Sequence, residues 1–423
     1  MATCVLAAGL APPAGAGDAA SMLRAVETQA GAVAVHEKLA AVDLADLFGI
    51  LVVGTIPLPG VDPEGAAFGA RVSTALTGLQ RQCALNAIAA RPPASLRRFL
   101  AAQVTPEESR SMRKTALLLL APIAGSRDLA YGVSLVDGDL PRLARDFESF
   151  VSSTLTNDDL AHSLVKEMLR TSDTALRATL IRGVGAAGSE RGLALLDRFL
   201  YADDPNLELL LCQIARLARV IGQVDDEALS TSVRHFLTGE EPGIVGAAAR
   251  AAGALGDTAA IPELIALLDH ESGTVRGSVK DSLTELTGLR FATRRRWFLW
   301  YDSERAWWDT RWPSLAPALR TATRDTITSL LAESIGKRLE RDLLAREVAA
   351  LLDHDDELVR RLACQSLGQL GTAPVIPDLL SAMSDVDEAV AMSAWASLCD
   401  ITRLDLPNDP SACSQILEEA RDR

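Results

Sequence analysis

At 423 residues the chain is longer than one compact hydrophobic core usually organises, so several domains or an extended repeat architecture are expected. Hydrophobic residues make up 48% of it and aromatic residues 4%, and the abundance of Ala, Leu and Val favours helices over sheets. The formal net charge of −14 opposes non-specific binding to phosphate backbones or anionic membranes, because both need a positive field. The longest apolar run in the body, residues 48–54, is far too short to span a bilayer.

The first twenty residues allow two interpretations, a signal peptide and a disordered tail. Their apolar stretch is followed by Ala14-Gly15-Ala16, which fits the small-residue rule for signal-peptide cleavage and favours a periplasmic or secreted protein. No Lys or Arg precedes the stretch, however, and an Ala/Gly/Pro-rich tail fits it as well. Residues 21–104 are helical by pattern but are interrupted at residues 55–65, so we expect an irregular N-terminal helical cap.

An internal repeat at an offset of 115 residues is the clearest pattern in the chain, because residues 256–291 align without gaps with residues 371–406. The matched pairs include Ile261 with Ile376, Pro262 with Pro377, Val275 with Val390, Thr287 with Thr402 and Leu289 with Leu404. In each copy an Ile-Pro opens a first helix, an acidic turn follows, and a second helix begins near the valine. One such hairpin cannot bury its apolar face alone, so neighbouring hairpins must stack.

With these motifs the chain resembles the HEAT-like repeat family of the armadillo-type superhelix, in particular its short bacterial form. The residues that carry the resemblance are LLDHESGTVRGSVKDSLTELTG from Leu267, LLDHDDELVRRLACQSLGQLGT from Leu351 and ARAAGALGDTAAIPELIALLDH from Ala249. The resemblance implies an all-α fold, a right-handed superhelical solenoid of HEAT-like helical hairpins. It also implies that the turn aspartates cap the second helices and reach an arginine seven residues on; these pairs are Asp269 with Arg276 and Asp353 with Arg360.

Residues 287–313 hold five of the six tryptophans and separate the two copies of the repeat. The expected order is therefore a signal peptide or tail at 1–20, the cap at 21–104, HEAT-like repeats at 105–289, a tryptophan-rich helical insertion at 290–320, and HEAT-like repeats with a C-terminal helix at 321–423. On a helix the tryptophan rings of the insertion fall within an arc of about 140°, which is one face.

This face has two interpretations. In the first, the rings pack the insertion against the repeats, and the structural residues are Trp297, Trp308 and Trp312. In the second, the margin of the helix stays open to a partner, and the binding residues are Arg294, Arg295, Arg296, Trp300 and Trp307. The matching place after Thr402 carries smaller apolar residues at helical spacing, which favours packing.

Two motifs that resemble cofactor or metal sites have better structural interpretations. GVGAAG at residues 183–188 fits a dinucleotide-binding pattern, but it follows a helical stretch instead of a strand. His270-Glu271 and His36-Glu37 resemble the di-iron ligands of hydroxylases of the deoxyhypusine hydroxylase type, yet metal ligands must converge on one centre, and residues of one repeated turn are a repeat thickness apart. We assign no catalytic, cofactor-binding or metal-binding residues, and the widely spaced cysteines indicate neither disulfides nor a zinc site.

The repeat architecture without a catalytic constellation predicts a non-enzymatic scaffold or adaptor that binds another protein or peptide. A first alternative is binding of a nucleic acid or a base through the Arg/Trp segment, as in HEAT-like alkylpurine glycosylases, although the acidic charge speaks against it. A second alternative is an accessory protein to an enzyme, similar to HEAT-like bilin lyases. No residue argues for that role beyond the repeat itself.

Overall fold

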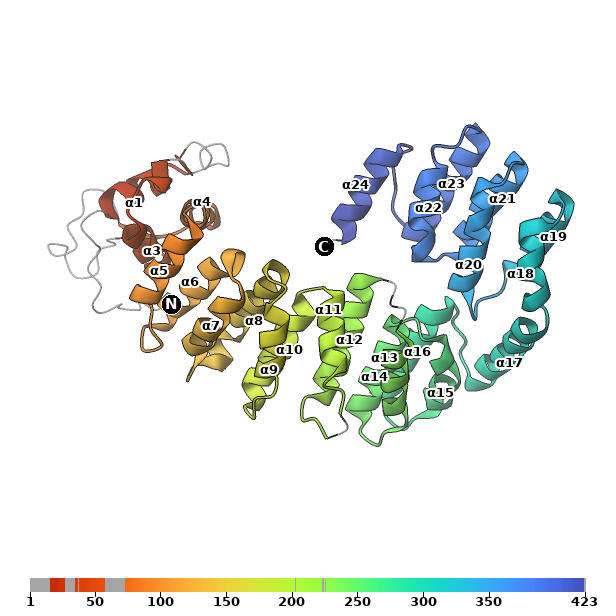
Figure 1. Ribbon diagram of the computed structural model, residues 1–423, viewed down its shortest axis with the longest axis horizontal. Coiled ribbons are helices and arrows are strands. Elements are labelled where there is room, and N and C mark those ends of the chain that lie inside the picture. Colours follow the sequence, from red (N-terminus) through yellow and green to blue (C-terminus); the bar gives the residue numbers. More distant parts are fainter. Residues whose placement is uncertain are drawn as a thin grey trace. The chain divides into compact units, whose positions relative to one another are not determined.

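The computed structural model describes residues 16–26, 35–36, 38–57, 73–201, 203–222, 224 and 226–421 (Figure 1). Most of the predicted signal peptide, including Ala14 and Gly15 of its cleavage motif, lies outside the described residues, as does Glu37 of the His36-Glu37 pair. The chain forms two compact units, Met1–Ala187 and Gly188–Arg423. The boundary between them falls inside residues 105–289, for which the sequence predicts one run of repeats.

Unit 1 consists of helices and one small sheet. Its helices are α1 (Ala16–Arg24), α3 (Leu44–Val53), α4 (Gly78–Ala89), α5 (Pro93–Gln103), α6 (Arg110–Leu120), α7 (Leu129–Val136), α8 (Leu140–Asn157), α9 (Ala161–Met168) and α10 (Thr174–Ala186), with short 3-10 turns η1 (Ala121–Ile123) and η2 (Ser126–Asp128). In the predicted cap, β1 (Thr55–Pro57) pairs antiparallel with β2 (Ser73–Ala75), with Ile56 opposite Thr74. The helical pattern of residues 21–104 does not predict this sheet.

Unit 2 is all-α in its described residues, as predicted. Its helices are α11 (Glu190–Asp197), α12 (Leu207–Ile221), α13 (Glu227–His235), α14 (Pro242–Ala254), α15 (Ile261–Ala266), α16 (Gly273–Thr287), α17 (Arg294–Thr310), α18 (Trp312–Thr321), α19 (Arg324–Ser334), α20 (Arg341–Ala349), α21 (Glu357–Leu370), α22 (Ile376–Ala382), α23 (Glu388–Thr402) and α24 (Pro410–Arg421). The second helices of successive hairpins pack on one another, α12 on α14, α14 on α16, and α21 on α23 (Figure 1). This stacking is the solenoid that the repeat predicts. Throughout the described parts of both units, every helix is too short or too polar to cross a membrane.

Contacts between stacked second helices recur at the offset of 115 residues. Ser282 Oγ of α16 donates a hydrogen bond to the Ala249 carbonyl of α14 at 2.7 Å. Ser397 Oγ of α23 donates to the Cys364 carbonyl of α21 at 2.8 Å. Both serines are buried, so each hydroxyl gains a partner that its burial requires. The offset seen in the sequence therefore corresponds to repeated interactions and not only to repeated hydrophobicity.

Glycines set the close approach of these helices. A Cβ atom at Gly253 would lie 2.8 Å from the Ser282 Cβ, and one at Gly368 would lie 2.9 Å from the Ser397 Cβ. These separations are shorter than van der Waals contact between carbon atoms, so a side chain at either position would push the helices apart. The two glycines are themselves 115 residues apart and thus fix the same helix spacing in both copies.

The second helices of the two copies also end alike. The hydroxyls of Thr287 and Thr402 donate back to carbonyls one turn earlier, at 2.6 and 2.7 Å. The next residue is left-handed in both, Gly288 with φ 72° and Arg403 with φ 59°. Arg403 is the one non-glycine residue with positive φ among the described residues, and it occupies a place that favours glycine.

The GVGAAG motif at residues 183–188 begins inside α10 and runs past the end of this helix at Ala186, as its register in the repeats predicts. A Cβ atom at Gly183 would lie 2.7 Å from Val151 Cγ1, so this glycine admits the neighbouring helix α8. Gly188 has φ 66° and lies in the turn that follows α10. The glycines thus serve helix packing and helix termination, and the motif lacks the strand that a dinucleotide site needs.

Candidate partner-binding site on the tryptophan-rich helices

The tryptophan-rich segment forms α17 and α18, and α17 contacts α15, the first helix of the preceding hairpin. Thr293 is the N-cap of α17, and its hydroxyl accepts from the backbone N–H of Arg296 at 3.4 Å. Pro313 lies in the first turn of α18, where proline is tolerated. In the second copy, α24 contacts α22, the counterpart of α15. Both helices that follow a repeat thus fold back on the hairpin before them.

A first group of rings fixes the beginning of α17. Trp297 is 1% exposed, and its ring centroid lies 4.9 Å from that of Phe291 and 5.6 Å from that of Trp300. Its indole N–H donates to the Phe291 carbonyl at 3.2 Å. In the second copy the equivalent carbonyl, that of Leu406, accepts from the indole of Trp395 at 2.9 Å. The same loop carbonyl therefore takes an indole N–H from the following helix in one copy and from the preceding helix in the other.

A second group of rings fixes the junction of α17 and α18. The centroid of the buried Trp308 ring lies 5.2 Å from that of Trp307 and 4.7 Å from that of Trp312. The Trp307 indole donates to Glu333 of α19 at 3.3 Å, and Arg311 forks onto the same carboxylate at 2.7 and 2.8 Å. Packing and an ion pair together hold this junction.

Glu304 is a buried carboxylate on the ring-bearing face of α17, and the sequence interpretation missed it. It is 5% exposed, and its Oε2 accepts from the backbone N–H groups of Arg338 and Leu339 at 2.9 and 3.3 Å. Lys337 lies 3.5 Å from its other oxygen. The spacing in the sequence could have predicted this burial. Glu304 lies four residues after Trp300 and four before Trp308, on a helix face that is otherwise apolar.

The surface of α17 that remains open differs from the predicted margin. Trp300 and Trp307 are half-buried, while Phe298 and Leu299 are 60% and 57% exposed. Those two side chains lie outside the ring-bearing arc, which is the signal that could have found them. The buried Trp297 separates them in sequence from the three exposed arginines of the prediction, Arg294, Arg295 and Arg296.

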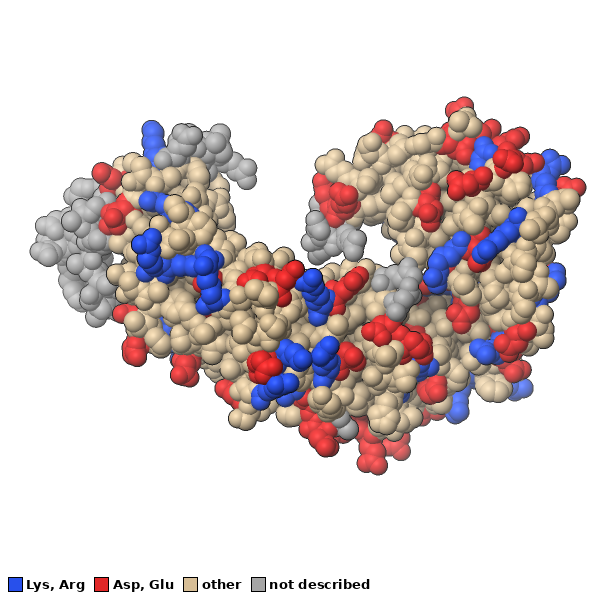
Figure 2. Space-filling view, in the orientation of Figure 1, with Lys and Arg blue, Asp and Glu red and all other residues tan. Residues whose placement is uncertain are grey.

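Charge is mixed around this site. Arg294 pairs with Asp269 at 3.3 Å, and both side chains are largely exposed. For Arg295 and Arg296 no ion pair or hydrogen bond of the side chain occurs within the described residues. Figure 2 shows acidic and basic side chains interspersed over the visible face of unit 2 instead of one continuous basic stripe.

The turn aspartates do not have the capping role that the resemblance implies. Asp269 is engaged by Arg294, and α16 has no side-chain N-cap. Helix α21 is capped by Asp356, whose carboxylate accepts two backbone N–H groups of the first turn. Asp353 lies too early to cap this helix, because it ends the 3-10 turn η6 (Ala350–Asp353) with its side chain exposed.

Arg276 and Arg360 reach the carbonyl oxygens of their turns instead of the turn aspartates. Nη1 of Arg276 donates to the carbonyls of residues 270 and 271 at 2.6 and 2.8 Å. Nη1 of Arg360 donates to those of residues 354 and 355 at 2.9 and 3.2 Å. Arg360 also forks onto Asp385 in the next turn, at 2.8 and 3.0 Å, and so links two hairpins.

A side-chain acceptor in a fixed position organises these turns. Nδ1 of His270 and Nδ1 of His354 each accept, at 3.0 Å, from the backbone N–H two residues further on. Asp385 and Thr171 do the same at 2.8 and 3.2 Å. The position lies five residues before a Leu or Val in the first turns of the second helices, namely Leu176, Val275, Val359 and Val390. Its own residue type varies, which hid the pattern in the sequence. Within the described residues, no three His, Cys, Asp or Glu side chains are grouped as metal ligands.

The sequence matches HEAT repeats over residues 214–284 and 313–422, and it matches no curated protein. Human deoxyhypusine hydroxylase in complex with glycerol is 16% identical, with a TM-score of 0.26 over 74% of this chain and 97% of its own. The complex of CpcE and CpcF of phycocyanin lyase from Nostoc is 14% identical, with a TM-score of 0.30 over 85% and 98%. Importin beta is 13% identical, with a TM-score of 0.34 over 91% of this chain and 55% of its own. None of these structural likenesses bears on function.

Proposed function

We propose that this chain, which matches HEAT repeats over residues 214–284 and 313–422, acts as a non-enzymatic scaffold or adaptor that binds another protein or a peptide. The surface that we assign to the partner is the open side of α17, formed by Arg295, Arg296, Phe298 and Leu299. Fold-level analogy alone would leave the location of the contact open. The exposed side chains of this helix support the location that we propose.

One observation carries the proposal, the exposure of Phe298 and Leu299 at 60% and 57%. Large apolar side chains that are exposed at consecutive positions near arginines resemble the composition of binding hot spots. Trp297 anchors the same turn of the helix in the core, so the exposed pair rests on a rigid support. A rigid support lowers the entropy that binding costs.

Crosslinking from this surface tests the proposal. A photoreactive amino acid at position 295 should capture a partner in cells, which mass spectrometry identifies and which is then purified for a binding measurement. The double substitution Phe298→Ser and Leu299→Ser should weaken that binding at least tenfold, which is about 1.4 kcal/mol. Val386→Ser is the matched control, because Val386 is 99% exposed elsewhere in unit 2. Equal binding by the double variant and the control would remove α17 from the interface.

Nucleic-acid binding has less support than protein binding at this site. Its sequence argument requires ring faces on which bases could stack. The rings of the segment pack against one another, as the 4.7 and 4.9 Å centroid separations illustrate, and the net charge of −14 opposes a polyanion. Binding of duplex or single-stranded DNA at low salt, lost in Arg295→Gln and Arg296→Gln, would reverse this preference. For an enzyme-accessory role no side-chain arrangement of α17 argues either way.

A further inference from the structure

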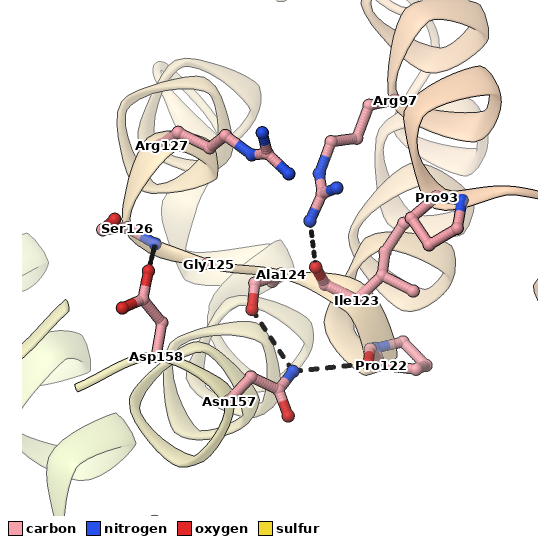
Figure 3. Close-up of a pocket in the computed structure, with 10 residues that line it drawn as sticks. All are labelled: Pro93, Arg97, Pro122, Ile123, Ala124, Gly125, Ser126, Arg127, Asn157 and Asp158. Atoms are coloured by element: carbon pink, nitrogen blue, oxygen red, sulfur yellow. Dashed lines mark hydrogen bonds between the residues drawn. The ribbon is translucent and has the colours of Figure 1, made fainter. Parts of the chain in front are cut away.

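An open surface cavity of about 710 Å³ lies in unit 1, whereas α17 belongs to unit 2. It is bounded by the beginning of α5, the end of α8 and the segment that runs from η1 into η2 (Figure 3). Pro93, Pro122 and Ile123 provide apolar walls, and the polar side chains come from two arginines, a serine, an asparagine and an aspartate. No motif of the sequence pointed to this place.

Asn157 and Asp158 hydrogen-bond to backbone groups that border the cavity and so fix its shape. Asn157 Nδ2 donates to the carbonyls of residues 121, 122 and 124 at 3.3, 3.3 and 3.2 Å. Asp158 accepts from the backbone N–H groups of Ser126 and Leu160 at 2.7 and 2.9 Å. The Ser126 N–H is the main reason that the pKa of Asp158 lies below its usual range, so this carboxylate stays ionised near neutral pH. Both side chains hold the connecting segment in place.

The two arginines remain partly available. Arg97 Nε donates to both oxygens of the buried Asp128, at 3.1 and 3.0 Å, and Arg97 Nη2 donates to the Ile123 carbonyl. Within the described residues this leaves Arg97 Nη1 without a hydrogen bond. Arg127 is exposed and makes neither a hydrogen bond nor an ion pair with any described residue. Figure 3 shows its guanidinium extending toward that of Arg97 from the opposite side of the cavity.

From this geometry we propose that the cavity binds a carboxylate group through Arg127 and Arg97. Two guanidinium groups that face each other repel, and an anion held between them is attracted to both. The planar fork of arginine matches the two oxygens of a carboxylate. Pro93, Pro122 and Ile123 can cover the aliphatic stem that carries it.

The charge balance favours a carboxylate over a phosphate. Arg97 and Arg127 contribute two positive charges, and Asp128 and Asp158 contribute two negative charges that lie beside them. A carboxylate brings one further negative charge and a phosphate at neutral pH nearly two. Because the four side chains have no net charge, they do not compensate the larger desolvation cost of the phosphate, and the singly charged carboxylate fits better. The carboxylate can belong to a free aliphatic acid or to a glutamate side chain of a peptide.

The test follows the arginine Nε–H signals of the full-length protein by NMR during titration with four probes. The probes are propionate, the capped peptide acetyl-Gly-Glu-Gly-amide, inorganic phosphate and the neutral analogue propionamide. Propionate and the peptide should shift the Arg97 signal saturably, while propionamide should not. Tighter binding of the peptide than of propionate identifies a peptide as the source of the carboxylate, and the reverse order identifies a free acid.

Arg127→Gln should weaken carboxylate binding at least tenfold, because a charge-assisted hydrogen-bonded pair is removed. Arg145→Gln is the matched control: this exposed arginine lies twelve residues before Asn157 on α8, about 18 Å along the helix axis. Protection of the Arg97 Nε–H from solvent exchange in both free variants, as in the wild type, verifies that its hydrogen bond to Asp128 and the cavity are intact. Three results would each overturn the proposal. Propionamide could shift the Arg97 signal as much as propionate does, phosphate could bind more tightly than propionate, or Arg127→Gln and Arg145→Gln could bind carboxylate equally well. Failure here leaves the α17 proposal untouched, because the two sites share no residue.

Discussion

Gly368 of α21 lies against Ser397 of α23 so closely that a Cβ atom on the glycine would come within 2.6 Å of the serine Oγ and 2.9 Å of its Cβ. The serine hydroxyl is already committed to the Cys364 carbonyl at 2.8 Å. It therefore cannot move aside without leaving a buried donor unpaired. The stacking of two hairpins depends on the absence of a side chain at one position.

Gly368→Ala should accordingly lower the free energy of unfolding by about 1–3 kcal/mol, although alanine is the better helix former. The matched control is Gly277→Ala, in the exposed middle of α16, where nothing lies within 4 Å of an added Cβ. That substitution should raise the free energy of unfolding by about 0.5–1 kcal/mol. Urea titration followed by circular dichroism measures both. Equal effects in the two variants would mean that contact with Ser397 does not limit the helix spacing.

Asp385→Asn should remove a link between hairpins. Arg360 forks onto Asp385, both side chains are nearly buried, and this hydrogen bonding lowers the pKa of Asp385. An aspartate with a lowered folded-state pKa stabilises the fold above its unfolded pKa of about 4, and the contribution is lost as the pH falls through the folded value. The variant should lose about 1.5–3 kcal/mol at pH 7 and less at pH 3. Urea midpoints at the two pH values measure the difference.

The control for this substitution is Asp353→Asn, which tests the resemblance-derived role at the same time. Asp353 is exposed and does not cap α21. The structure therefore predicts a change within about 0.5 kcal/mol, as for ordinary surface substitutions. A loss of more than about 1 kcal/mol in Asp353→Asn would restore the capping role that the resemblance implied.

Asp257 should make stability depend on pH in the opposite sense to Asp385. Burial raises its pKa to about 6, mainly by desolvation, while Arg234 beside it offsets part of the effect. The Arg234 Nε lies 3.1 Å from Oδ2 of Asp257, but its N–H is not aimed at that oxygen, so the contact is an ion pair without a hydrogen bond. A raised folded-state pKa means that the folded state holds the proton more tightly, so stability falls as the pH rises between about 4 and 6.

Wild-type protein should therefore lose up to about 3 kcal/mol from this group as the pH rises across that interval. Asp257→Asn should flatten the curve there, as seen in the difference between wild-type and variant stability measured by urea titration at half-unit pH steps. Asp269→Asn, at an exposed aspartate, should leave the curve unchanged. A difference curve that is flat between pH 4 and 6 would show that Asp257 ionises normally in the folded protein.

Arg403→Gly should stabilise the end of α23. Arg403 has φ 59°, a conformation that costs a non-glycine residue about 1–2 kcal/mol, and its counterpart in the first copy is Gly288. Part of the gain is offset by the greater freedom of glycine in the unfolded chain, so we expect a net rise of about 0.5–1 kcal/mol. Gly371→Ala, at φ 69°, should instead lower the free energy of unfolding. Thermal unfolding of the two variants compares them directly.

Substitutions at two adjacent residues of α17 should have different effects, one on stability and the other on partner binding. Trp297→Ala removes a ring that is 1% exposed and should cost about 3–5 kcal/mol. Phe298→Ala removes a ring that is 60% exposed and should change stability by no more than about 0.5 kcal/mol while weakening partner binding. Urea titration gives the first quantity and the binding measurement on the captured partner gives the second. A large stability loss in Phe298→Ala would make this side chain part of the fold.

The sequence predicts the repeat because the 115-residue offset preserves contacts as well as hydrophobicity. Ser282 and Ser397 occupy matching positions and donate to matching carbonyls. Outside the aligned copies the prediction weakens, since the β1–β2 pair joins residues across a segment with no periodicity. Glu304 shows a different limit: helical spacing places it on the inner face, but its partners lie on a loop 34 and 35 residues away, and only the tertiary structure brings them together.

Charge and exposure were the least predictable features of the candidate sites. Helical periodicity identifies the ring-bearing face of α17, and Trp297 and Trp308 are buried there. Periodicity does not predict which of the other side chains are covered by neighbouring helices. The exposure of Phe298 and Leu299 therefore went unnoticed. The cavity beside Arg97 and Arg127 depends on contacts between α5, α8 and the η1–η2 segment, and no local pattern encodes them.

Because the hydrogen bond between stacked helices in one copy recurs 115 residues later in the other, the chain can be lengthened by splicing. A second copy of residues 257–371, inserted after Gly371, would bring its own Ser282 to the carbonyl of Cys364 and would offer a new Cys364 carbonyl to Ser397. Each junction would reproduce an existing one, with glycine and serine in contact at the same spacing. We expect such a lengthened chain to fold. The unit of duplication would then be the whole 115-residue block, including its tryptophan-rich helices.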